Sequence, residues 1–220
     1  MRALFVAATL SLLCAAPSLA QGERGYVTGV GGFAASTDAT SGNILFDAGV
    51  RVAPHLLVFG NLGQFHNLQP SDALPAVDST MATVAGSLGL NVIGTARVPA
   101  LYSVGGLRYE IPTRARVLPY VSAGLGFARL SPSAQFTYSS GPLPDGTTPV
   151  VGTDVTSELV TAGYFTTPPN TTAFMYTLGG GVDIPVAHHW AVDVGYRFSR
   201  ISADTPLNAQ GMTFGFGYRF

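Results

Sequence analysis

The last ten residues of the chain alternate strictly between two kinds of side chain. The even-numbered positions are large and mostly aromatic: Met212, Phe214, Phe216, Tyr218 and Phe220. The odd-numbered positions are glycine, threonine or arginine. Because successive side chains of a β-strand point to opposite faces, the pattern predicts a strand with one apolar and one polar face. A row of four aromatic rings on a terminal strand is typical of a face that meets lipid.

The first twenty residues have the pattern of a secretion signal. Arg2 supplies a positive charge, an apolar stretch follows it, and Ser18-Leu19-Ala20 matches a small-x-small cleavage site. We therefore expect residues 1–20 to be a cleaved signal peptide and residues 21–220 to be the mature domain. The only cysteine, Cys14, lies in this signal, so no disulfide or thiol chemistry is expected in the mature chain.

The composition of the chain agrees with a membrane-embedded sheet. Only 10% of the residues are charged, far below the ~25% of a soluble domain, while 27 residues are glycine. After residue 20, no apolar run approaches the ~18 residues that a membrane-spanning helix needs. Together with secretion, these features predict a transmembrane β-barrel. The formal net charge of −1 and the absence of lysine give no indication of a nucleic-acid partner.

The same alternation recurs along the chain and divides it into strands and connections. Eight strands are predicted, at residues 25–33, 43–52, 56–64, 98–111, 118–130, 172–184, 190–199 and 211–220. Short connections fall at residues 53–55, 112–116 and 185–189, and longer ones at 34–42, 67–97, 131–171 and 202–210. Outer-membrane barrels have short periplasmic turns and longer extracellular loops. We therefore predict an all-β fold, a single eight-stranded, antiparallel, up-and-down transmembrane β-barrel.

Two of the long connections contain patterns of their own. In residues 67–97, a set of apolar residues recurs at helical spacing and predicts a short amphipathic helix: Val77, Met81, Val84, Ala85 and Leu88. The alternation of residues 118–130 continues through Phe136 and Tyr138, so this strand is expected to project beyond the membrane. Residues 155–165 could return beside it as a second strand.

With these features, the chain resembles the small eight-stranded outer-membrane barrels. The group includes the OmpA membrane domain, OmpX, the Ail-type adhesins and the broad outer-membrane β-barrel domain family. The resemblance covers nearly all of the mature chain and implies the outer membrane of a Gram-negative bacterium. Its most specific residues look like the terminal signal that is recognised by the barrel-assembly machinery: Phe214, Phe216, Tyr218 and Phe220.

The inward positions of the predicted strands collect four acidic residues and four arginines. They are Asp47, Arg51, Arg108, Glu110, Asp183, Asp193, Arg197 and Arg219. An eight-stranded barrel leaves an interior just wide enough for side chains, and buried charges have to be paired. We therefore expect a lumenal network of ion pairs that fills the barrel. A gated pore or proton path through these residues is the alternative.

Two further arginines have the opposite, outward parity. Arg129 and Arg200 follow the apolar bands of their strands and are expected at the extracellular rim, where lipopolysaccharide phosphates lie. Arginine binds phosphate through two parallel hydrogen bonds. The sequence thus predicts contact with outer-membrane lipid and lipopolysaccharide, with a solvated rim charge as the alternative.

No catalytic, metal or cofactor site is predicted. His55, His188 and His189 fall in predicted periplasmic turns without metal-ligand spacing. His66 is the one histidine near the predicted outer rim. Lipid A deacylases resemble this architecture and use a His-x-Ser pair, but Asn67 and Leu68 follow the histidine here. Nucleophilic catalysis therefore has no constellation of residues in this chain.

The long loops are the remaining functional surface. Residues 131–171 are poor in charge and rich in threonine, serine and proline, and loops above ~15 residues are usually functional or disordered. We expect a non-enzymatic structural or adhesion-type protein acting through residues 67–97 and 131–171 on an extracellular protein, for instance by strand addition. A small porin-like channel and, after it, a lipid-A-modifying enzyme are the alternatives.

Overall fold

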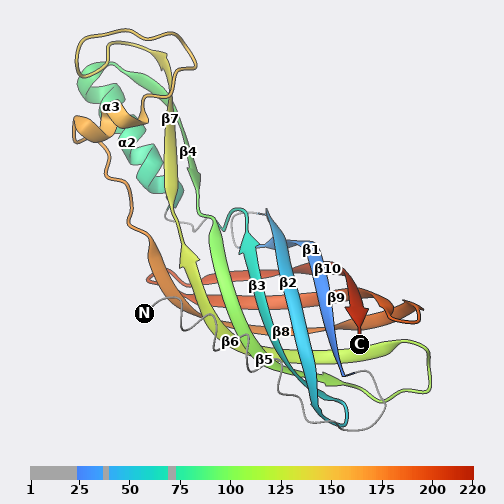
Figure 1. The fold of residues 1–220 in the computed structure, drawn as a ribbon. Coiled ribbons are helices and arrows are strands. Elements are labelled where there is room, and N and C mark those ends of the chain that lie inside the picture. The colour runs from blue at the N-terminus through green and yellow to red at the C-terminus, as the bar shows by residue number, and fades with distance from the viewer. Residues whose placement is uncertain (1–23, 37–39, 69–72) are drawn as a thin grey trace, which may run out of the picture.

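The computed structural model describes residues 24–36, 40–68 and 73–220, so the expected signal peptide lies outside the described residues. Eight antiparallel strands form a closed barrel in the order β1-β10-β9-β8-β6-β5-β3-β2, which confirms the predicted fold (Figure 1). They are β1 (Gly25–Ala35), β2 (Thr40–Ala53), β3 (Leu56–Phe65), β5 (Ala100–Glu110), β6 (Leu118–Leu130), β8 (Thr171–Ala187), β9 (Trp190–Ser202) and β10 (Leu207–Arg219). The first and last strands close the barrel, from Tyr26 opposite Arg219 to Ala35 opposite Gln210.

The barrel wall separates the two kinds of side chain that alternate in the sequence. In β2, Ile44 is 75% exposed, whereas its neighbours Asn43 and Leu45 are buried. In β10, Phe214 and Phe216 lie on the outside. The outer face of the barrel is therefore largely apolar, as a surface in contact with hydrocarbon requires.

A second unit, which we call the head (residues 73–97 and 133–165), stands beyond one end of the barrel (Figure 1). Its two-stranded ribbon consists of β4 (Asn91–Arg97) and β7 (Ser133–Ser140) and extends the β5–β6 hairpin. The helices α2 (Ala73–Leu88) and α3 (Thr156–Thr161) accompany this ribbon. Their apolar residues enclose a separate core that includes Val77, Val84, Phe136, Leu159 and Phe165. Neither helix among the described residues is long and apolar enough to cross a membrane.

The head confirms some predictions for the long loops and corrects others. The helix is confirmed as α2, and the projecting strand through Phe136 and Tyr138 is confirmed as β7. The suggested returning strand at 155–165 is wrong, because α3 occupies this segment. The partner of β7 is β4, a segment for which the sequence predicts a loop. The alternation of apolar and polar residues in β4 is weak, because Gly94 and Ala96, which face α2, are small residues of the kind that is common in loops.

The connections differ in length from those expected. At one end of the barrel, the predicted turn at 185–189 shrinks to His188 and His189, since β8 continues through Pro185 with an irregularity in register. Proline is tolerated in a strand at such an irregularity. At the other end, two predicted loops shrink to residues 36–39 and 203–206. Only the two connections that build the head are long.

Large side chains fill the barrel where the neighbouring strand carries glycine. A Cβ atom on Gly63 would lie 2.5 Å from Tyr102 Oη and 2.6 Å from Leu45 Cβ. Tyr102 is fully buried, and its hydroxyl donates to Asn43 Oδ1 at 3.0 Å. Gly60, on the same strand but facing outward, would place a Cβ atom in open space.

These two glycines give a matched test of the interior packing. We expect Gly63→Ala to lower the free energy of unfolding by about 1–3 kcal/mol, because overpacking displaces neighbouring side chains. Gly60→Ala should leave it unchanged. The urea midpoint of each variant in detergent micelles measures the effect, and equal loss in both variants would contradict the assigned faces.

Candidate functional site

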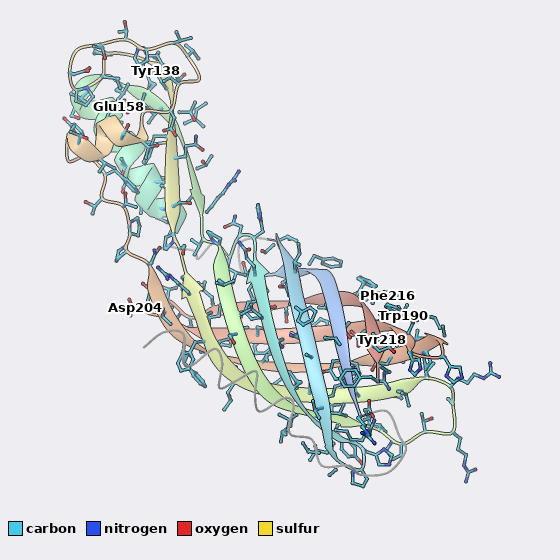
Figure 2. The ribbon with its side chains drawn as sticks, in the orientation of Figure 1. Tyr138, Glu158, Trp190, Asp204, Phe216 and Tyr218 are labelled. Carbon is cyan, nitrogen blue, oxygen red and sulfur yellow. The ribbon has the colours of Figure 1, made fainter. Side chains whose placement is uncertain are left out.

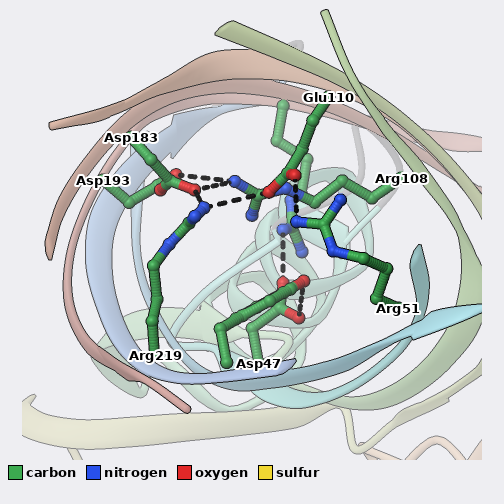
Figure 3. A network of polar contacts seen from close by, with 9 residues as sticks. Asp47, Arg51, Arg108, Glu110, Asp183, Asp193 and Arg219 are labelled. Carbon is green, nitrogen blue, oxygen red and sulfur yellow. Dashed lines mark hydrogen bonds and ion pairs between the residues drawn. The ribbon is translucent and has the colours of Figure 1, made fainter. Parts of the chain in front are cut away.

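The end of the barrel with the short turns contains a chain of ion pairs that crosses the interior (Figure 3). Arg219 Nη2 lies 3.0 Å from Glu110 Oε1 and 2.5 Å from Asp183 Oδ2. On the other side of Glu110, Arg51 Nη2 lies 2.6 Å from Oε2. Glu110, Asp183 and Arg219 are all buried. Two arginines from β2 and β10 thus hold carboxylates from β5 and β8.

Arg108 joins this chain to the aromatic side chains of the interior. Its guanidinium contacts the Asp183 carboxylate, and its Nη2 lies 4.0 Å from Asp193 Oδ2. Its Cζ is 3.5 Å from the ring centre of Tyr120 and 4.8 Å from that of Tyr26. An arginine over an aromatic face is stabilised by the ring quadrupole. The cation is therefore held by carboxylates and by π faces.

A second, smaller group lies further inside the barrel. Arg197 Nη2 lies 3.3 Å from Asp47 Oδ2, and the Tyr26 hydroxyl donates to Asp47 Oδ1 at 3.0 Å. The structure thus brings the eight inward residues of the sequence prediction into two ion-paired groups. Within each group, the positive and negative charges balance. Tyr26 and Tyr120 were not predicted as members, although Tyr120 has the inward parity that identifies one.

The other end of the interior is mainly apolar. Phe65, Leu68, Met175 and Ile201 are fully buried there. The segment that carries Leu68 is fixed across the mouth, because Leu68 N donates to Val98 O at 2.8 Å and Val98 N donates to Asn67 Oδ1 at 2.9 Å. The barrel interior is therefore charged toward the short turns and closed by packed hydrocarbon toward the head.

No group in the described interior is arranged for chemistry on a substrate. Two cavities in the described interior have volumes of about 10 Å³ each, which is room for a single water. No cluster of three or more His, Cys, Asp or Glu within the described residues could hold a metal ion. His66 lies at the head end, and Asn67 beside it is used to cap Val98. The lumen is a filled structural core.

The loop between β7 and α3 exposes two adjacent apolar residues. Val150 and Val151 are 80% and 69% exposed. The turn that presents them is held by Thr153, whose N–H and hydroxyl donate to Val150 O at 3.1 and 2.7 Å. Gly152 has a φ of 93°, and its N–H donates to Tyr138 O at 2.9 Å. We call Val150 and Val151 the valine tip.

The head carries carboxylates and, apart from Arg97 at its base, no basic residue. Its acidic residues are Asp78, Asp145, Asp154 and Glu158. The Thr156 hydroxyl and N–H donate to Asp154 Oδ1 at 2.6 and 2.9 Å and hold the pKa of this carboxyl below its usual value. Thr147 lowers the pKa of Asp145 in the same way. The head therefore stays anionic at neutral and mildly acidic pH.

Both edges of the β4–β7 ribbon are partly covered by other segments of the head. Along β7, Tyr138 N donates to Thr153 O at 2.8 Å and Val155 N donates to Phe136 O at 2.9 Å. Beside β4, the Gly94 N–H points to Met81 Sδ of α2 at 3.1 Å. The geometry thus favours side-chain contacts of the head over the strand addition suggested by the sequence.

The predicted rim arginines lie on the outer wall near the head. Arg129 and Arg200 are exposed and flank β8, with Arg129 opposite Thr172 and Arg200 opposite Tyr176. Arg97, on the exposed face of β4, is a third arginine at this level that the prediction missed. Its signal was the odd-numbered parity that it shares with the outward Leu101 and Leu107 of the adjoining β5.

Aromatic rings gather on the outer wall at the opposite end (Figure 2). Trp190 stacks on Phe216 with ring centres 4.9 Å apart, and Tyr218 meets the Trp190 ring edge-on at 5.3 Å. The four residues expected to form the assembly signal are all exposed on this wall: Phe214, Phe216, Tyr218 and Phe220. Such amphipathic rings favour the interface between hydrocarbon and headgroups.

Comparison with known proteins agrees with this architecture. The family model of the outer membrane protein beta-barrel domain matches residues 5–220. Neisserial surface protein A is similar in structure, with a TM-score of 0.54 at 16% identity, over 91% of this chain and 98% of that chain. A major outer membrane protein from Thermus thermophilus gives 0.50 at 11% identity, over 89% and 99%. At such identities the structures show the fold alone. No curated protein sequence matches this chain significantly.

The ion pairs of the interior predict a large effect of losing one cation. Asp183 and Asp193 are directly opposite in the β8–β9 pairing, so Arg108→Met would leave two facing carboxylates with less compensation. We expect the free energy of unfolding to fall by about 3–5 kcal/mol, as for other broken buried pairs. Urea unfolding in micelles measures it.

Two further variants control this experiment. Arg114→Met, in the exposed turn after β5, should have no measurable effect. Adding Asp193→Asn to Arg108→Met should recover part of the loss, because it removes one of the facing charges. An Arg108→Met barrel as stable as the parent would show that the network contributes nothing.

Proposed function

Because the chain belongs to the outer-membrane β-barrel domain family, we propose that it is a non-enzymatic surface protein of the outer membrane whose head makes the functional contacts. Its role is then structural or adhesive. One observation carries this proposal: the head has an apolar core of its own and stands clear of a barrel that is filled. A loop that only joined two strands would need no core.

The orientation of the barrel follows from the lengths of its connections. Outer-membrane barrels turn their short connections to the periplasm, which assigns the two-residue turns at 54–55 and 188–189 to that side. The head then lies outside the cell. Export through the expected signal peptide, residues 1–20, and insertion by the barrel-assembly machinery through Phe214, Phe216, Tyr218 and Phe220 complete this proposal.

The partner of the head is a neutral or basic protein surface. Adjacent branched apolar side chains held in a fixed turn form a contact that loses little conformational entropy on binding, and the valine tip has this property. The four carboxylates of the head disfavour polyanionic ligands, because like charges facing each other across an interface are repulsive. A protein pocket lined by apolar and basic groups fits both features.

The valine tip provides a direct test. Bacteria that display the protein should attach to cultured epithelial cells or to one another, and Val150→Ser plus Val151→Ser should reduce attachment severalfold. Deletion of residues 141–169 should abolish it. Heat-modifiable gel mobility, which reports a folded barrel, should be unchanged in the double variant.

Val160→Ser is the matched control, since Val160 is also exposed but lies on α3, away from the tip. We expect attachment by this variant to equal that of the parent. Full attachment after deletion of residues 141–169, with the barrel folded, would exclude the head as the contact.

We also propose that Arg129 and Arg200 contact lipopolysaccharide phosphates, with Arg97 above them. All three are exposed, and guanidinium groups bind phosphate through paired hydrogen bonds. Arg129→Ala plus Arg200→Ala should reduce the lipopolysaccharide that co-purifies with the protein severalfold. Arg114→Ala plus Arg116→Ala, in the turn at the opposite end, is the control. Equal retention in both double variants would leave these arginines as solvated rim charges.

The alternative functions find less support in the geometry. A channel would have to pass the packed layer around Leu68 and Met175 and then the ion pairs of Arg108. Steady single-channel currents from the purified protein in planar bilayers would support a channel function. A lipid-A-modifying enzyme would need a nucleophile or base beside His66, where Asn67 and Leu68 instead close the mouth.

A further inference from the structure

A small cavity lies between the two ion-paired groups of the barrel interior. Its volume is about 10 Å³. Charged residues of both groups line it: Asp47 and Arg197 from the smaller group, and Arg108 and Asp193 from the larger. The hydroxyl residues Tyr26, Thr28, Tyr120 and Ser122 complete the polar part of the lining. The lining side chains come from β1, β2, β3, β5, β6 and β9.

Three charged side chains of this lining have a polar atom that lacks a hydrogen-bond partner. Within the described part of the chain, these atoms are Arg108 Nε, Asp193 Oδ2 and Arg197 Nη1, and each is shielded from solvent. Asp193 Oδ2 is 4.0 Å from Arg108 Nη2, beyond the range of a direct hydrogen bond. Buried polar atoms without partners are costly and are usually satisfied by ordered water.

The lining determines the chemical class of ligand that fits. An anion would face the carboxylates of Asp47 and Asp193, and a cation would face the guanidinium groups of Arg108 and Arg197. The unsatisfied atoms include two N–H donors and one carboxylate acceptor, so the ligand has to accept and donate hydrogen bonds. The volume admits one water molecule and nothing larger.

We propose that this cavity is a binding site for one structural water. The water accepts a hydrogen bond from a guanidinium N–H and donates one to Asp193 Oδ2. It thereby adds a hydrogen-bonded link between the Arg197–Asp47 pair and the larger group around Arg108, beside the contacts that Tyr26 makes with Asp47 and Arg108. The apolar layer at the head end prevents exchange in that direction. We expect this water to exchange slowly with bulk solvent.

The intact protein tests the site directly. A high-resolution crystal structure should show one ordered water within hydrogen-bonding distance of Asp193 Oδ2, and crystals soaked in bromide should show no anomalous peak there. In micelles, nuclear Overhauser contacts should connect a long-lived water with amide protons of residues that line the cavity. An empty cavity or a bromide peak would overturn the proposal.

A variant that fills the cavity tests its contribution to stability. Ser122→Val replaces a lining hydroxyl with a larger apolar group, and Ser103→Val makes the same change on the outer face of the neighbouring strand. We expect Ser122→Val to displace the water and raise the unfolding equilibrium constant in urea roughly tenfold. Ser103→Val should leave both unchanged. A Ser122→Val barrel with unchanged stability and no water would show that no ligand is needed.

Discussion

The closure of the sheet is the constraint on which the rest of this structure depends. In hydrocarbon, no water satisfies the N–H and C=O groups of an open edge, so a spanning sheet has to pair its first strand with its last. Here β1 meets β10 along nearly its whole length. The backbone amides of Gly25 and Phe220 exchange hydrogen bonds of 2.9 and 3.0 Å at the end of this seam.

Closure with eight strands leaves an interior that has to be filled by side chains. The chain fills it in two different ways. Toward the head, apolar side chains such as Phe65 and Met175 pack together with a few uncharged polar residues such as Asn43. Toward the short turns, arginines and carboxylates neutralise one another around the rings of Tyr26 and Tyr120. Glycine residues on the neighbouring strands provide the space that these large side chains need. Because its interior is filled, the barrel supports the head and offers no chamber for a substrate.

The head has an apolar core of its own, as a domain surrounded by water requires. Its ribbon continues the β5–β6 hairpin, but a two-stranded ribbon alone is marginally stable in water. The helices α2 and α3 supply the apolar face that the ribbon needs. At Gly94, α2 comes so close that a Cβ atom would collide with Val77. This packing explains why a long, charge-poor connection can carry an exposed apolar tip in a fixed position.

The sequence by itself determined the barrel, the facing of its strands and the inward set of charges, because these follow from an alternation of period two that is local to each strand. It also identified α2 from helical spacing. Only the tertiary structure decided which charges meet, since Arg219 and Glu110 are brought together by closure and are 109 residues apart. The same holds for the pairing of β4 with β7 and for α3, where short segments carry weak periodicity and take their form from the core they share. The sequence of each strand determines which face its side chains take, whereas the way the sheet closes determines which side chains meet.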